Sequence, residues 1–455
     1  MEAKEYVLDL ISKARIAQQE FETFSQEKVD EAVRAIGKAI YDEGDMLAKM
    51  AVEETRMGLY EDKIMKNKGK SKAVWNKLKG VKSRGIIRYI EEEGLVEVAK
   101  PIGVIGAVTP TTNPTMTPMQ NAMIALKGAN AIIVCPHPRA KKTGEKSVEI
   151  MRDALEKVGA PKDLIQIVPE PSVEVSGLVM QLCDACVSTG GPGMVKAAYS
   201  SGKPAFGVGA GNVQCIVDDD ADLKVVIPKV VRGRTYDNGI LCTCEQSVHI
   251  PEEKYDEAVK MLIDAGAYYF DKSDELNALR NTMFPDGKLI NKDVVGASPQ
   301  TIAKMAGITV PDSIKFLLAP VKAAGVGEPL AREKLCPVLA IYSYKTWEEA
   351  VANAVTNLNM EGAGHSAVLH SSNKEHIEYA AELLPVSRVG INMIGSSGLG
   401  GGFDNGLNPT ATLGCGSWGN NSISENLWWH HLVNIQKVAY LMPEKKIPTD
   451  EEIWG

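Results

Sequence analysis

The chain has 455 residues, of which 44% are hydrophobic and 24% charged, and its formal net charge is -8. This length exceeds a single compact core and predicts two or three domains. The negative charge argues against nucleic acid as a main partner. The first residues lack the pattern of a secretory signal, and no apolar run is long enough to cross a bilayer. We therefore expect a cytoplasmic protein with no membrane partner, whose eight cysteines are reduced thiols.

Helices are predicted over residues 1–80. Val29, Val33, Ile36 and Ile40 lie at i, i+4, i+7 and i+11, which places them on one apolar stripe of a helix. After residue 80, short β-rich runs are broken by glycine and proline. This change of pattern predicts a hairpin over 82–99, followed by a buried strand.

Strands and helices then alternate along the chain. Strands are predicted at 102–110, 131–138, 164–168 and 184–191, and helices at 118–130, 144–161, 173–183 and 192–201. The alternation resumes after residue 236, with strands at 247–251 and 338–344 and helices at 252–270 and 346–357. This order predicts an α/β fold with two doubly wound parallel-sheet domains, whose ligands bind beyond the carboxyl ends of the strands.

The stretch TYDNGILCTCEQ contains two cysteines that are candidates for chemistry, Cys242 and Cys244. Free cysteine is usually a small buried hydrophobe, so each of them has a purely structural alternative. Cys183 and Cys186 form a single C-x-x-C without a second pair, which is poor evidence for a metal site. We expect that pair to be structural, and we predict no metal site.

Two strand ends carry residues that suit phosphates. Gly190 and Gly191 lie between a predicted strand and a predicted helix, where backbone N–H groups and the helix N-terminus favour an anion. The CPHPRAKK stretch follows another strand and is either a solvated basic loop or a seat for an adenosine 2′-phosphate or the phosphates of CoA. Its candidate cofactor-binding residues are His137, Pro138 and Arg139.

Several blocks in the right order resemble the aldehyde dehydrogenase superfamily, and within it the CoA-acylating branch. They are TPTTNPTMTP, STGGPGMVKAAYSSGKPAFGVGAGN, YDNGILCTCEQSV, EKLCPV, EGAGHSAVLHS and LGCGSWGNNSISEN. The resemblance implies a cofactor-binding domain over 1–235 with 82–99 as a β arm, and a catalytic domain over 236–426. It also implies a segment, 427–455, that returns to the arm. Arm segments pair across subunits in this superfamily, so we expect a homodimer or a dimer of dimers.

The resemblance also implies roles for individual residues. Cys242 is expected to be the nucleophile, with Cys244 a bystander. Asn113 and the Cys242 backbone N–H are expected to bind the oxyanion that forms on the aldehyde. Glu333 is expected to hold the ribose of the nicotinamide cofactor, NAD or NADP. Pro110, Thr111 and Gly209 are further expected cofactor contacts, in addition to the glycines and basic residues above.

One departure from the family pattern concerns water. Members that release a free acid carry a general-base glutamate in an E-L-G-G-K block, whereas the corresponding stretch here is AFGVGAGN, which has no carboxylate. Without a base to activate water, a thioester on Cys242 should persist until the thiol of CoA accepts the acyl group. The implied activity is therefore the conversion of an aldehyde, CoA and NAD(P)⁺ into acyl-CoA and NAD(P)H.

The resemblance favours succinate semialdehyde as the aldehyde, with sulfoacetaldehyde and acetaldehyde as alternatives. An anionic aldehyde needs a cationic pocket, for which Arg234 is the candidate, although a surface arginine on a helix is the simpler interpretation. His365 either assists proton transfer at the thiols or is satisfied by core hydrogen bonds. Two other classes remain open: a cysteine acyltransferase without a redox cofactor, and a non-catalytic scaffold.

Overall fold

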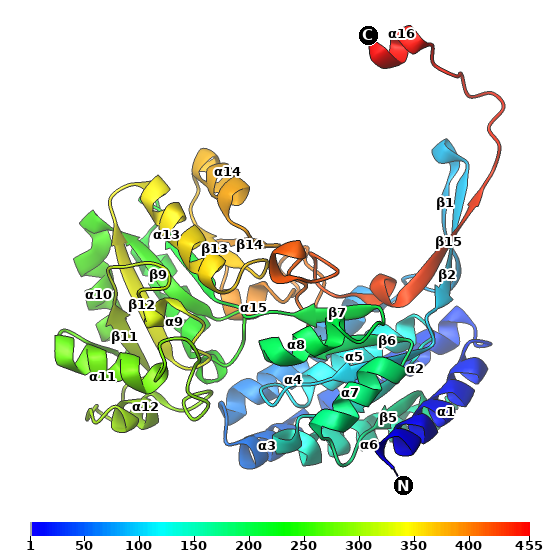
Figure 1. Ribbon diagram of the computed structural model, residues 1–455, viewed down its shortest axis with the longest axis horizontal. Helices are drawn as coiled ribbons and strands as arrows, with labels where there is room; N and C mark the ends of the chain where they lie inside the picture. The colour runs from blue at the N-terminus through cyan, green and yellow to red at the C-terminus, as the bar shows by residue number, and fades with distance from the viewer. Residues whose placement is uncertain (1) are drawn as a thin grey trace.

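A computed structural model describes residues 2–455, and its chain is organised around three sheets (Figure 1). A five-stranded sheet and a seven-stranded sheet are each covered by helices, and a three-stranded sheet projects from the first of these bodies. The α/β class and the arm are thus as predicted. No helix among the described residues has the length and apolar character that a membrane span requires.

Four helices precede the first sheet. Their bounds are α1 (Ala3–Phe21), α2 (Gln26–Asp42), α3 (Gly44–Thr55) and α4 (Tyr60–Leu78). Ser25 caps α2 by accepting a hydrogen bond from the Lys28 N–H. The predicted stripe of α2, from Val29 to Ile40, is fully buried against the first core, because its apolar positions share one face of the helix.

The first sheet is parallel and has the strand order β5-β4-β3-β6-β7. Its strands are β3 (Val104–Val108), β4 (Ala131–Cys135), β5 (Ile165–Ile167), β6 (Ala185–Thr189) and β7 (Ala205–Val208); its helices are α5 (Met116–Lys127), α6 (Lys141–Lys157), α7 (Val173–Leu182) and α8 (Pro192–Tyr199). The order reverses direction between β3 and β6. Ligands bind at such a switch point in open α/β sheets, and the loops that carry residues 110–113 and 190–191 leave the sheet there.

The second sheet is also parallel, with the order β10-β11-β12-β9-β8-β13-β14. Its strands are β8 (Val213–Val217), β9 (Glu245–Pro251), β10 (Ala267–Tyr269), β11 (Phe316–Pro320), β12 (Val338–Tyr344), β13 (Ala367–His370) and β14 (Val389–Ile391). Its helices are α9 (Leu223–Thr235), α10 (Tyr255–Asp264), α11 (Ser273–Met283), α12 (Pro299–Met305), α13 (Trp347–Met360), α14 (Lys374–Leu383) and α15 (Gly395–Gly398).

Two features of this second sheet differ from the sequence-based expectations. The chain passes from the first sheet to the second between β7 and β8, so α9 packs with the second sheet although it precedes the expected boundary at residue 235. The helix expected over 252–270 is shorter, because Gly266 adopts a φ of 109° after α10 and the next residues form β10. A glycine with positive φ just past the last turn is a common helix stop.

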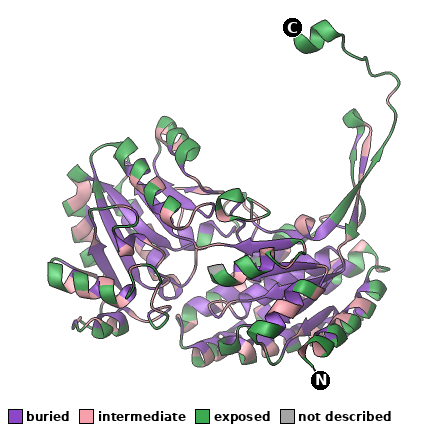
Figure 2. Ribbon diagram, in the orientation of Figure 1, coloured by how far each residue is buried: buried purple, intermediate pink, exposed green. Residues whose placement is uncertain are grey.

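The third sheet is the arm. The hairpin of β1 (Gly85–Ile90) and β2 (Leu95–Pro101) is joined by β15 (Val433–Ala439) in the antiparallel order β1-β2-β15, with Ile435 opposite Ala99. Beyond it the chain runs to α16 (Asp450–Trp454), which lies well away from the two bodies (Figure 1). Much of the arm and the whole tail are exposed (Figure 2), including the large side chains of Tyr89, Leu441 and Trp454.

Candidate active site

The candidate nucleophile follows a turn with unusual backbone geometry. Asp237, Asn238 and Gly239 have φ angles of 50°, 53° and 65°, so three successive residues are left-handed just before Cys242. A residue with a Cβ loses roughly 1–2 kcal/mol in this conformation. The D-N-G sequence suits such a turn, but tertiary contacts must also hold it in place.

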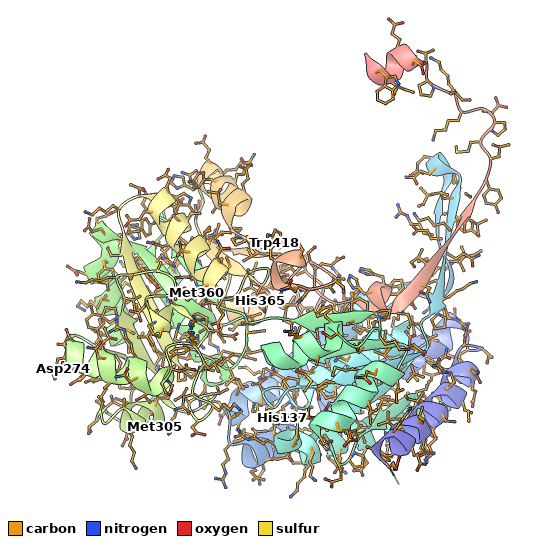
Figure 3. The ribbon with its side chains drawn as sticks, in the orientation of Figure 1. His137, Asp274, Met305, Met360, His365 and Trp418 are labelled. Atoms are coloured by element: carbon orange, nitrogen blue, oxygen red, sulfur yellow. The ribbon has the colours of Figure 1, made fainter. Side chains whose placement is uncertain are left out.

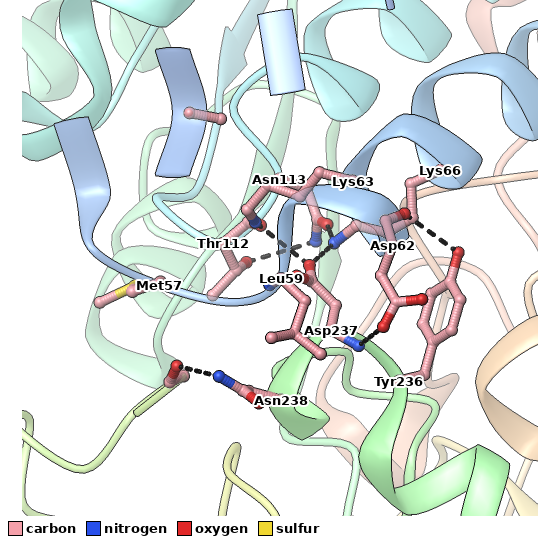
Figure 4. Close-up of polar contacts among 12 residues, drawn as sticks. Met57, Leu59, Asp62, Lys63, Lys66, Thr112, Asn113, Tyr236, Asp237 and Asn238 are labelled. Carbon is pink, nitrogen blue, oxygen red and sulfur yellow. Dashed lines mark hydrogen bonds and ion pairs between the residues drawn. The ribbon is translucent and has the colours of Figure 1, made fainter. Parts of the chain in front are cut away.

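Side chains of α4 and the backbone at its start supply these contacts (Figure 4). The fully buried Asp237 carboxylate accepts a hydrogen bond from the Leu59 N–H at 2.6 Å and forms ion pairs with Lys63, at 3.1 Å, and with Lys66. The Asp237 N–H in turn donates to the Asp62 carboxylate at 2.7 Å. Burial, reinforced by the charge of Lys66, lowers the pKa of Lys63 to about 8. The turn is therefore fixed by charge as well as by backbone hydrogen bonds.

Asn113 belongs to the same cluster, although it comes from the other sheet. It lies on the loop between β3 and α5, where Lys66 donates to Asn113 Oδ1 and Asn113 Nδ2 donates to Thr112 Oγ1 at 3.3 Å. Pro110 and Thr111 lie on the same loop, half-buried and buried respectively. The structure thus brings the asparagine loop and the nucleophile turn together through one ammonium group.

Cys242 differs from the other seven cysteines in its exposure. It is half-buried, whereas all the others, including Cys183, Cys186 and Cys244, are buried. Burial of its thiol raises the pKa of Cys242, as do the nearby charge of Glu333 and the neighbouring Cys415 thiol, while a nearby arginine, Arg388, lowers it. Burial likewise raises the pKa of Cys244 to about 12. Cys242 is thus the cysteine whose residue is partly exposed, although its thiol lies in a desolvated environment.

The stretch expected to lack a general base lies directly against Cys242. A Cβ on Gly211 would come within 1.9 Å of the Cys242 carbonyl oxygen, so no side chain fits at this position. The Gly211 N–H donates to Glu333 Oε1 at 2.7 Å. Glu333 is half-buried, and burial together with the charge of Glu361 raises its pKa to about 7. The Gly209 N–H points at Cys415 Sγ, 3.5 Å away.

Arg234 lies in the protein interior, which differs from its expected place at a substrate pocket. Its side chain is fully buried and donates to the carbonyl oxygens of Glu245, at 2.8 Å, and Gly239, at 2.6 Å, and to Gln246 Oε1 at 2.7 Å. These acceptors come from the nucleophile turn and the start of β9. The surface-arginine interpretation fails as well, because the guanidinium connects backbone segments beneath the turn.

Arg388, which precedes β14, lies near the thiols of Cys242 and Cys415, and His365, which precedes β13, lies near Arg388. His365 is fully buried, with Nδ1 3.0 Å from Ser366 Oγ and Nε2 without a hydrogen-bond partner within residues 2–455. Burial and the charge of Arg388 lower the pKa of His365 well below its usual value, so the imidazole is neutral near pH 7. Arg388 is itself buried, donates to the Gly414 carbonyl, and forms no ion pair in the described chain. The sequence analysis missed this arginine, which no motif marks.

The expected cofactor residues at the first sheet are more exposed. His137, Pro138 and Arg139 are all exposed after β4, where the Arg139 N–H donates to His137 Nδ1 at 3.1 Å. Partial burial and the charges of Arg139 and Lys292 lower the pKa of His137. At the N-terminus of α8, a Cβ on Gly191 would meet no other atom within 4 Å, so the backbone there borders open space. Figure 3 shows His137 apart from His365.

A cavity of about 580 Å³ opens between α8 and the end of α13. Tyr199, Gly209, Met360, Glu361 and Trp418 are among its lining residues, and Figure 3 shows Met360, His365 and Trp418 in the region where the two bodies meet. The cavity therefore reaches the glycine stretch that packs against Cys242 and Cys415. The sequence gives no signal for it, because its walls come from both sheets.

The sequence model of the aldehyde dehydrogenase family matches residues 2–271. The succinate-semialdehyde dehydrogenase (acetylating) of Clostridium kluyveri is 50% identical over 449 residues, which cover 99% of both chains. The sulfoacetaldehyde dehydrogenase of an Acholeplasma species is 41% identical over 99% of this chain and 93% of the relative.

Solved structures agree with these relatives. An acetylating aldehyde dehydrogenase from Geobacillus thermoglucosidasius superposes with a TM-score of 0.93 and 37% identity, covering 99% of both chains. A propionaldehyde dehydrogenase from Rhodopseudomonas palustris, solved with bound CoA and an acylated cysteine, gives a TM-score of 0.86 and 28% identity over 95% of this chain and 97% of the other. The chain therefore belongs to the aldehyde dehydrogenase family.

Proposed function

We propose that the protein is a CoA-acylating aldehyde dehydrogenase. It converts an aldehyde, CoA and NAD(P)⁺ into acyl-CoA, NAD(P)H and a proton, and succinate semialdehyde is the favoured aldehyde. The observation that carries this proposal is the position of Cys242: it is the one half-exposed cysteine of eight, and it packs against a glycine stretch that bears no carboxylate. The relatives with this activity in their names support it.

The residues beyond β4 and β6 suit a nicotinamide cofactor. Gly190 and Gly191 precede α8 beside open space, where backbone N–H groups and the helix dipole favour a pyrophosphate. The half-buried Glu333 carboxylate is suited to accept hydrogen bonds from ribose hydroxyls. When bound, the nicotinamide supplies the hydride acceptor of the reaction.

Catalysis begins when Cys242 loses its proton. Burial raises the pKa of Cys242, so the free thiol is protonated near pH 7 and needs a proton acceptor and a cation to form the thiolate. Because burial and the charge of Arg388 lower the pKa of His365, its imidazole is a weak base toward this thiol, so the proton passes to solvent, and the buried Arg388 guanidinium stabilises the thiolate charge.

The Cys242 thiolate then attacks the aldehyde carbon, and the carbonyl π electrons move to oxygen. The Asn113 amide and the Cys242 backbone N–H donate to this oxyanion. When the oxyanion re-forms the carbonyl, the C–H bond breaks, its electron pair leaves as hydride, and a thioester remains on Cys242. The aldehyde is oxidised and the nicotinamide reduced by two electrons.

CoA completes the reaction. Its thiolate attacks the Cys242 thioester, the C–S bond to Cys242 breaks, and the enzyme thiolate is restored. The absence of a carboxylate at residues 205–212 supports transfer to CoA over hydrolysis. The exposed His137 and Arg139 are suited to the phosphates of CoA or NADP.

The substrate proposal rests on the relative from Clostridium kluyveri, and sulfoacetaldehyde is the second candidate because of the relative from Acholeplasma. Arg234 does not support either anionic aldehyde, since its guanidinium is buried and engaged by backbone acceptors. We expect other donors to bind the carboxylate of succinate semialdehyde or the sulfonate of sulfoacetaldehyde.

A panel of succinate semialdehyde, sulfoacetaldehyde and acetaldehyde, assayed with both nicotinamides, tests the function. We expect reduced nicotinamide to accumulate in steady state only when CoA is present, and a thioester on Cys242, detected by mass spectrometry, when CoA is omitted. The proposal would be rejected if the protein released free acid without CoA as fast as it turns over with CoA. If calorimetry showed that neither NAD nor NADP binds, the acyltransferase or the scaffold would be favoured instead.

The arm supports a proposal about assembly. We propose a homodimer or a dimer of dimers, because β1 and β15 both leave an outer edge and the tail exposes Tyr440, Leu441 and Trp454. The same proposal places the protein in the cytoplasm, where its eight unpaired thiols remain reduced. A monomer in sedimentation velocity would contradict the assembly.

A further inference from the structure

The cluster beneath the nucleophile turn contains two buried lysines that pair with the same carboxylate. Lys63 and Lys66 lie one turn apart on α4, are 3% and 7% exposed, and both pair with Asp237, which is 0% exposed. Buried charge is costly unless each group is paired and hydrogen-bonded. Because the two ammonium groups share the Asp237 carboxylate, their remaining hydrogen bonds distinguish them.

The second role of Lys66 is its contact with Asn113. An ammonium group has donors only, so the atom of the amide that faces it must be Oδ1. This fixes which way the Asn113 amide is turned, and Nδ2 is directed away from the lysine. One Nδ2 proton reaches Thr112 Oγ1, at a long 3.3 Å, and the other is left to donate to a ligand.

Lys63 offers a natural comparison. It binds the same Asp237 carboxylate, from the same face of α4, but its remaining contact is with the Thr112 carbonyl oxygen at 3.3 Å and not with the Asn113 side chain. The two lysines therefore share the task of holding the turn. Only Lys66 also holds the amide.

We propose that Lys66 is a positioning residue that sets the Asn113 amide to stabilise the oxyanion formed on Cys242. The inference rests on the proposed function and names a residue that acts through Asn113. Its ammonium draws electron density from Oδ1 and so strengthens the Nδ2–H groups as donors. Through Asp237 it also couples the asparagine loop of the first sheet to the nucleophile turn of the second.

The matched substitutions are Lys66→Met and Lys63→Met. Each removes one ammonium from Asp237 while keeping an unbranched side chain of similar length. Loss of one oxyanion donor typically costs about a hundredfold to a thousandfold in rate, so we expect Lys66→Met to lower kcat about a hundredfold with little change in KM. We expect Lys63→Met to lower kcat less than about tenfold. Lys66→Arg, which keeps a cationic donor, should recover part of the lost kcat.

A double-mutant cycle with Asn113→Ala identifies the route of the effect. If Lys66 acts through Asn113, the double variant should be about as slow as Asn113→Ala alone, because the second substitution has nothing left to remove. Alkylation by iodoacetamide gives a second readout, since it consumes the Cys242 thiol without forming an oxyanion. We expect its rate in Lys66→Met to stay close to that of the wild type.

Three results would overturn the inference: additive effects in the cycle, equal losses in the two lysine variants, or alkylation that slows in step with kcat. The last result would mean that Lys66 merely supports the turn. Should Lys66→Met fail to fold, the same cycle and alkylation assay apply to Lys66→Ala, which likewise has no donor for Asn113. A wild-type enzyme without CoA-dependent turnover would instead refute the proposed function, which separates the two failures.

Discussion

Two turns with proposed roles in the reaction are built in opposite ways. The nucleophile turn at 237–239 is buried, left-handed and fixed by ion pairs from α4, whereas the basic turn at 137–139 is exposed and has one internal hydrogen bond from the Arg139 N–H to His137 Nδ1. Bond-making groups need a fixed geometry. Groups that bind an exchanging cofactor need only charge and access, because the ligand must leave in every cycle.

Removal of the nucleophile should have the largest effect. Cys242→Ser is expected to lower CoA-dependent turnover by a factor of about 10⁴ or more while leaving the fold intact, because the hydroxyl is a far weaker nucleophile than the thiolate. Cys244→Ala is the matched control and should retain most activity. Formation of reduced nicotinamide measures the activity of both variants. A fully active Cys242→Ser would mean that the cysteine after the nucleophile turn is not the nucleophile.

Arg234→Ala tests whether the nucleophile turn depends on the hydrogen bonds that the buried Arg234 guanidinium donates beneath it. We expect a loss of about 3 kcal/mol in the free energy of unfolding, because three buried acceptors around the turn lose a charged donor. Arg232→Ala, whose side chain is 40% exposed, should cost about 1 kcal/mol or less. Denaturant unfolding measures both. A stable Arg234→Ala with a raised KM for anionic aldehydes alone would restore the substrate role.

Glu333 combines features of the two turns, since it is half-buried near Cys242 and is the proposed contact to the cofactor ribose. Its pKa is raised to about 7, first by burial and then by Glu361. As pH falls through 7 the carboxylate becomes neutral and a weaker acceptor, so we expect the KM for nicotinamide to rise about tenfold between pH 8 and pH 6. Glu333→Gln should give a flat profile over this range.

The stability of the protein supplies a second measure of the same pKa. Because the folded pKa of Glu333 lies above the ordinary 4.5, the native state binds more protons than the unfolded chain between pH 4.5 and 7. Its contribution to stability therefore falls as pH rises across that window, and Glu333→Gln should remove this fall in thermal unfolding. If Glu333→Gln instead lowers release of free acid, the carboxylate serves as a base toward water.

The exposed turn should give the smallest effect. Arg139→Ala is expected to raise the KM for CoA or NADP about twofold to fivefold without changing kcat, because a solvent-exposed charge contributes about 1 kcal/mol or less. The difference from the wild type should diminish at high salt, where exposed charges are screened. A loss of kcat would show that this turn, like the nucleophile turn, affects the chemistry.

Much of the fold was predictable from local pattern. The buried stripe of α2 follows from its 3.6-residue period, and β3 to β6 follow from short apolar runs bounded by glycine and proline. The change of sheet between β7 and β8 was not predictable, since both strands are short apolar runs and only their pairing distinguishes them. Strand partners are non-local, and no residue in the 209–212 stretch marks the change.

The candidate site was likewise predictable only in part. The resemblance carried by YDNGILCTCEQSV predicted Cys242 as the nucleophile, and the missing carboxylate could be read directly from AFGVGAGN. The burial of Arg234 could not be read, because an arginine near a helix end is usually exposed and its acceptors come from residues that the turn brings back beneath it. Arg388 lies almost 150 residues from Cys242, and only folding places it near the thiol.

By itself the sequence predicted the alternation of strands and helices, the candidate thiol and the absence of a carboxylate from residues 205–212, because each depends on residues close together in the chain. Only the tertiary structure decided how the nucleophile turn is held and that the Glu333 carboxylate lies near Cys242. Lys66, Asn113 and Asp237 lie on three separate segments, and their contacts exist because packing brings those segments together and places the buried charges against one another.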